Sequence, residues 1–242
     1  MRTVLFIDLD NTLVINPLGR HALPSVYRYL EEKYSIDPEE VKRYMIRRNL
    51  ELLKIDPVKA FDWDYILQEY ISARLGIIET RAIVLDEHLK HCSKTLVFDD
   101  VIESLEILRR EGYVMILATN GLSKYQECVI RHTGLYKYFD EIHTPDKIGF
   151  TKNSERFYQI YSLDLGEENI EKIVIGDDLY FDVYYPSSIG LRTILVKRFS
   201  GENRNIYLEY FGINYERIKP SRVVNSLKEL SIVIKELAST DL

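Results

Sequence analysis

Short runs of apolar residues, rich in β-branched side chains, recur along the chain without alternating with polar residues. Five of them stand out, at residues 4–7, 114–118, 173–175, 193–196 and, more weakly, 223–224. Runs of this kind are typical of parallel strands that are buried on both faces of a sheet. They predict five strands of one buried parallel sheet.

Apolar residues with helical spacing lie between these runs. Ile102, Leu105 and Leu108 fall on one stripe that stops before Gly112, and glycine commonly follows the last turn of a helix. A second stripe lies within residues 227–237. Strands that alternate with helices in this way predict an α/β fold, with an open parallel sheet covered by helices on both faces.

One long interval interrupts the alternation. About 100 residues separate the first apolar run from the next one, whereas a plain βαβ unit needs only ~30. Asp37 and Pro38 have the pattern of an N-cap followed by proline at the first helical position. The apolar positions within residues 63–71 follow the spacing of one buried helix face. We therefore expect an all-helical module over residues 16–95, inserted into a core of residues 1–15 and 96–242.

Composition narrows the class of protein. The 242 residues are 46% hydrophobic and 29% charged, which excludes a wholly disordered chain. The net charge of −6 argues against a general nucleic-acid binder and against a polybasic protein of the membrane surface. The apolar run at residues 4–7 ends at Asp8 and is too short for a signal peptide or a membrane span. We expect a soluble, cytoplasmic protein.

The cysteines and histidines form no recognisable metal motif. Cys92 and Cys128 lie far apart in the sequence, so neither a disulfide framework nor a zinc finger is expected. His88 and His91 are three residues apart on a presumed helix, but no third ligand lies near them. We interpret them as a pair on the surface of the protein.

The strongest local signal is the pair of carboxylates in Asp8-Leu-Asp10-Asn-Thr12, directly after the first predicted strand. In an open α/β sheet, ligands bind beyond the carboxyl ends of the strands. Side chains two residues apart on an extended chain point the same way, so Asp8 and Asp10 can face one site. Neighbouring carboxylates repel unless a cation neutralises them, and Mg²⁺ prefers oxygen ligands. The alternative is an acidic turn that caps the following segment.

Two further strands end in polar residues of the same kind. Thr119-Asn120-Gly121 offers a hydroxyl, an amide and free backbone N–H groups, which suit a bound anion. Gly176-Asp177-Asp178, with Asp182 after it, places several carboxylates together. Taken alone, each segment could be an ordinary turn or a helix N-terminus. Because all three segments follow apolar strands, we expect them to converge on one edge of the sheet.

These three segments resemble three of the four motifs of the haloacid dehalogenase-like (HAD) hydrolase superfamily. The fourth motif is a lysine, which Lys152 in Gly149-Phe-Thr-Lys152 matches best, although Asn153 stands where the family more often has proline. Lys147 is the other candidate. The resemblance covers roughly residues 1–15 and 96–240. The insert matches the C1-type cap of the family in its position and helical character, and the resemblance implies a Rossmann-like core.

The resemblance also implies a Mg²⁺-dependent phosphohydrolase. In that family the residue matching Asp8 is the nucleophile, which forms an aspartyl-phosphate, and the residue matching Asp10 is the general acid and base. Thr119, Asn120 with its neighbouring backbone N–H groups, and Lys152 are then expected to bind the phosphoryl oxygens.

The same resemblance implies a set of metal ligands. They are the Asp8 carboxylate, the backbone carbonyl of Asp10 and Asp177, whereas Asp178 and Asp182 are expected to act behind them or through water. An acid at position 10 separates subgroups of the family, because dehalogenases lack it. Its presence favours phosphate esters over haloacids.

Two features of the insert bear on the substrate. A phosphonatase needs a lysine in its cap, and Lys54 and Lys59 are expected to be solvated instead. Arg47 and Arg48 are likewise expected on a solvated helix face rather than at an acidic group of the substrate. Short phosphorylated metabolites, sugar phosphates and nucleoside monophosphates all stay open as substrates.

Three alternatives to a phosphatase are considered. A phosphomutase uses the same aspartyl-phosphate but returns the phosphoryl group to its substrate. A receiver domain of two-component signalling, a different class, would leave the insert unexplained, and an inactive scaffold would not need a metal-binding carboxylate cluster. The sequence therefore predicts a phosphatase that binds a small phosphate ester, and neither nucleic acid nor a membrane.

Overall fold

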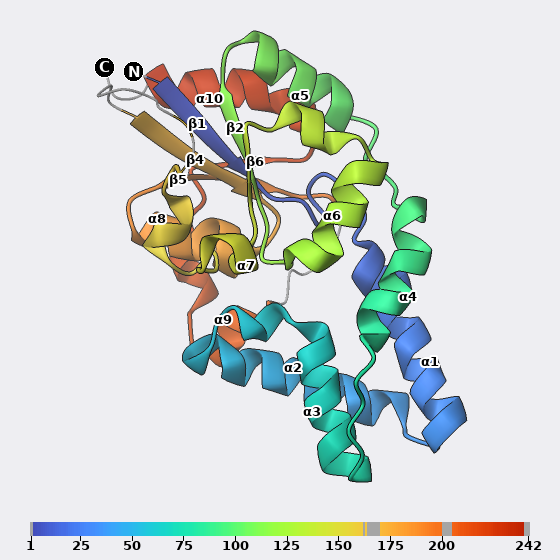
Figure 1. Ribbon diagram of the computed structural model, residues 1–242. Helices are drawn as coiled ribbons and strands as arrows, with labels where there is room; N and C mark the ends of the chain where they lie inside the picture. Colours follow the sequence, from blue (N-terminus) through green and yellow to red (C-terminus); the bar gives the residue numbers. More distant parts are fainter. Residues whose placement is uncertain (1, 162, 164–169, 200–204, 240–242) are drawn as a thin grey trace.

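Parallel strands form one open sheet in the computed structural model, which describes residues 2–161, 163, 170–199 and 205–239 (Figure 1). In this part of the chain the order across the sheet is β3-β2-β1-β4-β5-β6, and every neighbouring pair is parallel. The strands are β1 (Arg2–Ile7), β2 (Val114–Ala118), β3 (Glu141–His143), β4 (Ile170–Gly176), β5 (Arg192–Val196) and β6 (Arg222–Val224). The predicted α/β fold is confirmed.

The edge strand β3 was not expected from the sequence. The five predicted strands are β1, β2, β4, β5 and β6, and each coincides with an apolar run. β3 has no such run, because two of its three residues, Glu141 and His143, are polar. Both are nevertheless buried. Their polar atoms have partners there, because His143 Nε2 lies 2.8 Å from a Glu141 carboxylate oxygen and its Nδ1 lies 3.0 Å from the Phe157 carbonyl. A buried strand can therefore form here without a run of apolar residues.

The two faces of the sheet are covered by different helices. Alternate residues of β1 point to opposite faces, as expected for a strand. Leu5 and Ile7 pack in a core with α5 (Val101–Arg110), α6 (Ser123–His132) and α10 (Leu230–Ser239). Val4 and Phe6 pack on the other face, which is covered by the segment around Phe157, α7 (Pro145–Ile148) and α8 (Tyr185–Ser188).

The register of the central strands brings their carboxyl ends to the same level. Ile7 of β1 lies beside Leu117 of β2 and beside Ile175 of β4. The residues that follow these positions therefore emerge together at one edge of the sheet. This register is what converts three segments far apart in the sequence into neighbours.

The insert between β1 and α5 is helical, as predicted. Its helices form a layer beyond the carboxyl ends of the strands (Figure 1). They are α1 (Leu23–Tyr34), α2 (Pro38–Ile55), α3 (Trp63–Leu75) and α4 (Ile83–His91). The Asp37 side chain caps α2 by accepting a hydrogen bond from Glu39 N, and the residues Ile66, Leu67, Tyr70 and Ile71 form the buried face of α3. No helix among the described residues is long and apolar enough to cross a membrane.

One predicted helix stripe is partly wrong. α5 buries Val101, Leu105 and Leu108, whereas Ile102 is exposed. Positions 101, 105 and 108, which are four and three residues apart, lie on one helix face just as positions 102, 105 and 108 do. The helix therefore turns Val101 rather than Ile102 toward the sheet.

Two chain segments connect the insert to the rest of the protein, and they run side by side. Ile15 N donates to Leu96 O at 2.9 Å, and Phe98 N donates to Leu13 O at 3.1 Å. We refer to these paired segments, residues 13–15 and 96–98, as the connecting ribbon.

The two cysteines are paired, which corrects the expectation that they have no disulfide role. Cys92 directly follows α4 and Cys128 lies on α6, with 6.0 Å between their Cα atoms. A separation of 36 residues in the sequence did not indicate this contact, because it arises only when α4 packs against α6. The bond links the end of the insert to a helix that covers the sheet.

The insert also contacts the core through polar groups. Lys124 of α6 forms an ion pair with Asp62 at 2.6 Å. The neighbouring Tyr125 hydroxyl donates to the Asp64 carboxylate at 2.8 Å and accepts from the Asp64 N–H at 3.0 Å. The same carboxylate accepts from the backbone N–H groups of Val84 and Leu85 at the start of α4. Asp64 therefore joins α3, α4 and α6.

Replacing Asp64 is expected to destabilise the protein. Asp64 is only 4% exposed, so Asp64→Ala leaves two backbone N–H groups and a phenol without their acceptor in a buried place. We expect the free energy of unfolding to fall by about 2–4 kcal/mol, and by only about 1 kcal/mol in Tyr125→Phe, which removes a single hydroxyl. Urea unfolding of both variants measures this, and equal losses would contradict the central place given to Asp64.

Candidate active site

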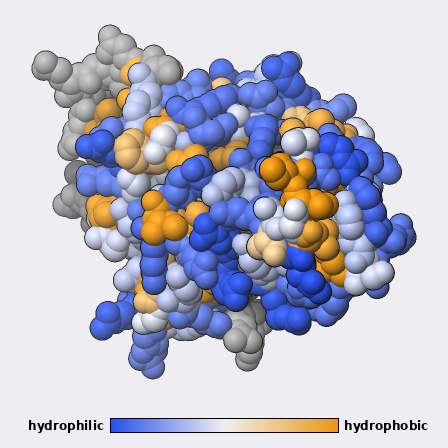
Figure 2. All heavy atoms as spheres, turned by 60° about the horizontal axis from the view of Figure 1, so that its bottom comes forward, coloured by the Kyte–Doolittle hydropathy of each residue, from blue (hydrophilic) through white to orange (hydrophobic). Residues whose placement is uncertain are grey.

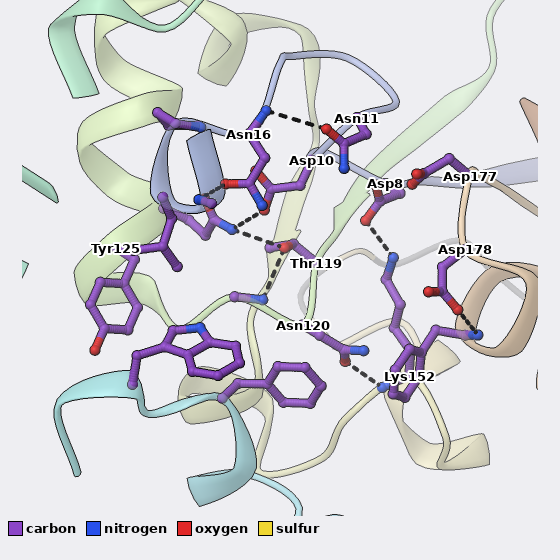
Figure 3. Close-up of a pocket in the computed structure, with 18 of the residues that line it drawn as sticks. Asp8, Asp10, Asn11, Asn16, Thr119, Asn120, Tyr125, Lys152, Asp177 and Asp178 are labelled. Atoms are coloured by element: carbon purple, nitrogen blue, oxygen red, sulfur yellow. Dashed lines mark hydrogen bonds and ion pairs between the residues drawn. The ribbon is translucent and has the colours of Figure 1, made fainter. Parts of the chain in front are cut away.

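The residues predicted to carry chemistry line one cavity at the carboxyl edge of the sheet (Figure 3). β1 leads into Asp8 and Asp10, β2 into Thr119 and Asn120, and β4 into Asp177. Lys152, Asp178, Asp182 and Gln126 also line the cavity, as do the polar residues Asn11, Asn16, His88 and Tyr125. Convergence of the motifs at one sheet edge is thus what the structure shows.

Lys152 is the lysine that reaches this cavity. Its side chain is only 2% exposed, and its Nζ lies 2.6 Å from Asp8 Oδ1 and 2.7 Å from Asp182 Oδ1. Burial alone would lower the pKa of Lys152, but the Asp182 and Asp8 carboxylates outweigh that effect and raise the pKa above its usual value. Lys147, the other candidate, is exposed and pairs with Glu127 at 2.9 Å instead.

Three carboxylates gather around the lysine. Oxygen atoms of Asp8, Asp177 and Asp182 lie within 4.8 Å of one another. Burial, and then the charges of Asp8 and Asp182, raise the pKa of Asp177 well above its usual value. Three carboxylates against one ammonium leave an excess of negative charge, so the donor set fits a hard divalent cation such as Mg²⁺.

Gly176 makes room for one of these carboxylates. A Cβ atom at this position would lie 2.3 Å from the Asp182 carboxylate carbon, closer than atoms can approach. The glycine that precedes Asp177 is therefore needed for Asp182 to reach Lys152. Asp182, whose role the sequence left open, belongs to the carboxylate cluster.

Asp10 has a different environment from Asp8. Its Oδ2 accepts a hydrogen bond of 2.6 Å from the Gln126 side-chain amide. Burial, and next the charge of Asp8, raise the pKa of Asp10 to about 7, while the Gln126 bond acts in the opposite direction. The two carboxylates at the end of β1 are thus distinguished by their partners, an ammonium for one and an amide for the other.

The hydrogen bonds around Thr119 fix the direction in which its hydroxyl can donate. Thr119 Oγ1 accepts from Gly121 N at 3.0 Å and from Gln126 Nε2 at 3.2 Å. Both partners are donors, so the single hydroxyl hydrogen has to point elsewhere. Gly121 leaves room for this arrangement, because a Cβ atom would lie 2.0 Å from Gln126 Nε2 and the Gln126 side chain would have to shift.

Two predicted site residues have additional or different partners. Asn120 lines the cavity, but its Oδ1 accepts from the backbone N–H of Lys152 at 2.9 Å, which fixes the segment that carries the lysine (Figure 3). Asp178 caps the turn that follows it, since its Oδ1 accepts from the backbone N–H groups of Tyr180 and Phe181, both at 2.8 Å. The Asp178 carboxylate also accepts from the Asn205 side-chain amide at 2.9 Å, and the Asp178 backbone N–H donates to Asp182 Oδ2 at 3.1 Å.

Sequence reasoning missed several polar residues of the cavity, among them Gln126 and His88. Gln126 lies in the middle of α6 and has no motif around it, so only its contact with Asp10 reveals it. His88, expected on the surface, is only 1% exposed and lines the cavity. Its Nε2 lies 2.8 Å from the Tyr125 carbonyl, a contact that depends on the packing of α4 against α6 and has no local signal. The surface interpretation of His88 was wrong.

Known proteins share both the sequence pattern and the fold. The family model of haloacid dehalogenase-like hydrolases matches residues 2–184. A ribulose-1,5-bisphosphate 5-phosphatase of Halopiger xanaduensis is 24% identical over 81% of this chain and 84% of its own length. A glyceraldehyde 3-phosphate phosphatase of Methanocaldococcus jannaschii is 24% identical over 98% of both chains.

A solved structure extends the likeness to three dimensions. The crystal structure of a HAD phosphatase from Thermococcus onnurineus superposes with a TM-score of 0.68, at 25% identity, over 97% of this chain and 98% of that one. The matching fold, the family model and the phosphatases among the relatives agree with the motifs found in the sequence. The chain therefore belongs to the haloacid dehalogenase-like hydrolase family and is a phosphatase.

Proposed function

We propose that this phosphatase hydrolyses small phosphate monoesters with the help of Mg²⁺ and through an aspartyl-phosphate. The observation that carries the proposal is the contrast between Asp8, which contacts the Lys152 ammonium at 2.6 Å, and Asp10, which contacts an amide and has a pKa raised to about 7. Neighbouring carboxylates with different environments suit different roles, one as nucleophile and one as proton donor.

The reaction has two steps in this proposal. In the first, an Asp8 oxygen attacks phosphorus, the bond from phosphorus to the ester oxygen breaks, and Asp10 gives its proton to the departing alkoxide. In the second, Asp10 takes a proton from water as the water oxygen attacks phosphorus. The bond from phosphorus to Asp8 then breaks, and inorganic phosphate and the free Asp8 carboxylate are formed.

Thr119 and Lys152 are proposed to bind the phosphoryl oxygens. The Thr119 hydroxyl already accepts two hydrogen bonds, so its own hydrogen is available for an oxygen of the substrate. The Lys152 ammonium, held between Asp8 and Asp182, is positioned before the substrate arrives. Donors fixed in this way stabilise negative charge as it develops in the transition state.

Asp8, the backbone carbonyl of Asp10 and Asp177 are proposed to hold Mg²⁺, with Asp182 beside them. When bound, the ion offsets the negative charge that Asp8 and the phosphate bring together. Thr12 supports this arrangement, because its hydroxyl donates to Asp177 Oδ1 at 3.4 Å. The helical insert, residues 16–95, is proposed to act as the cap that closes the site over the leaving group.

Asp8→Asn is expected to abolish turnover, because an amide cannot act as the nucleophile. With Mg²⁺ present, we expect release of inorganic phosphate from p-nitrophenyl phosphate to fall by at least about 10³-fold. The exposed Asp99→Asn is the matched control. Turnover like that of the wild type in Asp8→Asn would remove the nucleophile assignment, and turnover of the wild type without divalent ions would remove the metal.

Asp177→Asn is expected to weaken metal binding more than it changes the chemistry at saturating metal. We expect the Mg²⁺ concentration for half-maximal activity to rise by roughly tenfold or more, because a neutral amide replaces a charged ligand. A Mg²⁺ titration of initial rates measures this. An unchanged midpoint would exclude Asp177 as a ligand.

Gln126→Leu tests whether the amide orients Asp10 as the general acid. An alkoxide needs a proton in order to leave, whereas p-nitrophenolate leaves unaided. We expect kcat/KM to fall roughly tenfold more for ethyl phosphate than for p-nitrophenyl phosphate, since kcat/KM reports the step that breaks the ester bond. Gly121→Ala, which displaces Gln126, should reproduce the effect. Equal losses of kcat/KM on both esters would show that Gln126 does not orient the general acid.

A further inference from the structure

The cavity has two chemically different halves. Its volume is about 310 Å³, and its core half carries the carboxylates, Lys152 and Thr119 described above. The other half is formed largely by apolar side chains from the insert and from the core. They are Leu18, Leu23, Phe61, Trp63, Phe181 and Tyr207, and we refer to them as the apolar wall.

The insert contains many charged residues, but none of those that the structure describes lines the cavity. Arg47 and Arg48 lie on α2 outside the residues that line the cavity. Arg48 instead binds Glu69 of α3, with its Nε 2.7 Å from a carboxylate oxygen. Figure 2 brings the insert forward, and hydrophilic residues cover most of that face between a few hydrophobic patches. The insert therefore places its charges away from the cavity.

The insert adds the neutral polar residues Asn16 and His88 to the lining of the cavity. A carbonyl can only accept, so the His88 Nε2 that faces Tyr125 O carries the hydrogen and donates it. Burial lowers the pKa of His88 below its usual value, which keeps the ring uncharged. Its Nδ1 is then an acceptor, and it has no hydrogen-bond partner within the described part of the chain. A neutral acceptor suits a hydroxyl and repels an anion.

Among the residues that the structure describes, a second anionic group would find no cation in this half of the cavity. Among the described residues that line the cavity, Lys152 is the only one with a cationic side chain. Its ammonium is already within 2.7 Å of two carboxylates and lies where the reacting phosphate is proposed to bind. An anion moved from water onto aromatic side chains without a partner loses its hydration uncompensated.

We propose that the apolar wall binds the leaving group, and that this leaving group is an uncharged alcohol with an apolar or aromatic body. The enzyme then selects monoesters that carry one phosphate and no second anionic group. This inference rests on the proposed function, since it assigns the leaving-group half of the same site. The proposed substrate therefore differs from that of the Halopiger relative, whose name states a bisphosphate.

Alkyl esters with the same bond to phosphorus test the proposal, since their chemistry is matched and only the leaving group differs. We compare kcat/KM for 2-phenylethyl phosphate, ethyl phosphate, 3-phosphoglycerate and ribulose 1,5-bisphosphate, with Mg²⁺. Burying an aromatic ring should favour 2-phenylethyl phosphate over ethyl phosphate by roughly tenfold or more. Both anionic esters should fall below ethyl phosphate.

Variants of Trp63 locate the effect. Trp63→Ala should lower kcat/KM for 2-phenylethyl phosphate roughly tenfold more than kcat/KM for ethyl phosphate. The hydrolysis of ethyl phosphate that remains reports that the variant is folded. Tyr65→Ala is the matched control, because Tyr65 lies on the same helix outside the cavity and its hydroxyl bonds Glu69. Trp63→Arg, which adds a cation to the wall, should raise activity on the bisphosphate.

Each outcome bears on a different statement. Hydrolysis that depends on Asp8 but prefers the bisphosphate or 3-phosphoglycerate overturns this inference and leaves the proposed function intact. Equal effects of Trp63→Ala on both uncharged esters overturn the assignment of the wall. Absence of any hydrolysis that depends on Asp8 overturns the proposed function, and the inference with it. The predicted order of esters, lost in Trp63→Ala, supports the inference.

Discussion

The buried ammonium of Lys152 is the group on which the site depends. Its Nζ lies 2.6 Å from Asp8 and 2.7 Å from Asp182, and all three side chains are almost completely buried. Without the ammonium the carboxylates would repel one another, and without the carboxylates the ammonium would be stranded away from water. Three separate segments of the chain are therefore held in register by one charge. The same constraint prepares the phosphate half of the cavity before any ligand enters.

Local patterns were enough to predict the fold and the positions of most site residues. Apolar runs identified five strands, and a parallel sheet places the ends of its strands at one edge whatever separates them in sequence. That rule alone brought Asp8, Thr119 and Asp177 together. Lys152 follows no predicted strand, so it was predicted only from the resemblance to a family. Of Lys152 and Lys147, Lys152 is the one that is buried beside Asp8.

What the sequence could not indicate are contacts that exist only between packed helices. Gln126 and His88 sit on α6 and α4 and enter the cavity because those two helices meet. The strand at the sheet edge was missed for a related reason, since Glu141 and His143 satisfy each other in a place where apolar residues are the usual signal. α5 buries Val101 where the sequence pattern predicted Ile102. The two positions differ by one residue, and the spacing of apolar residues alone does not show which of them faces the sheet.

The Cys92–Cys128 bond has a mechanical consequence. It lies next to the connecting ribbon, so one corner of the insert is fastened to α6. This covalent link adds to the Asp62–Lys124 ion pair and the Asp64–Tyr125 hydrogen bond, which also join the insert to α6. His88, one turn before Cys92, is therefore held close to α6. At another end of the insert, the Lys54 ammonium at the end of α2 lies 4.3 Å from the centre of the Tyr210 ring of α9 (Ile206–Tyr210). Of these contacts between the insert and the core, only the one at α6 is covalent.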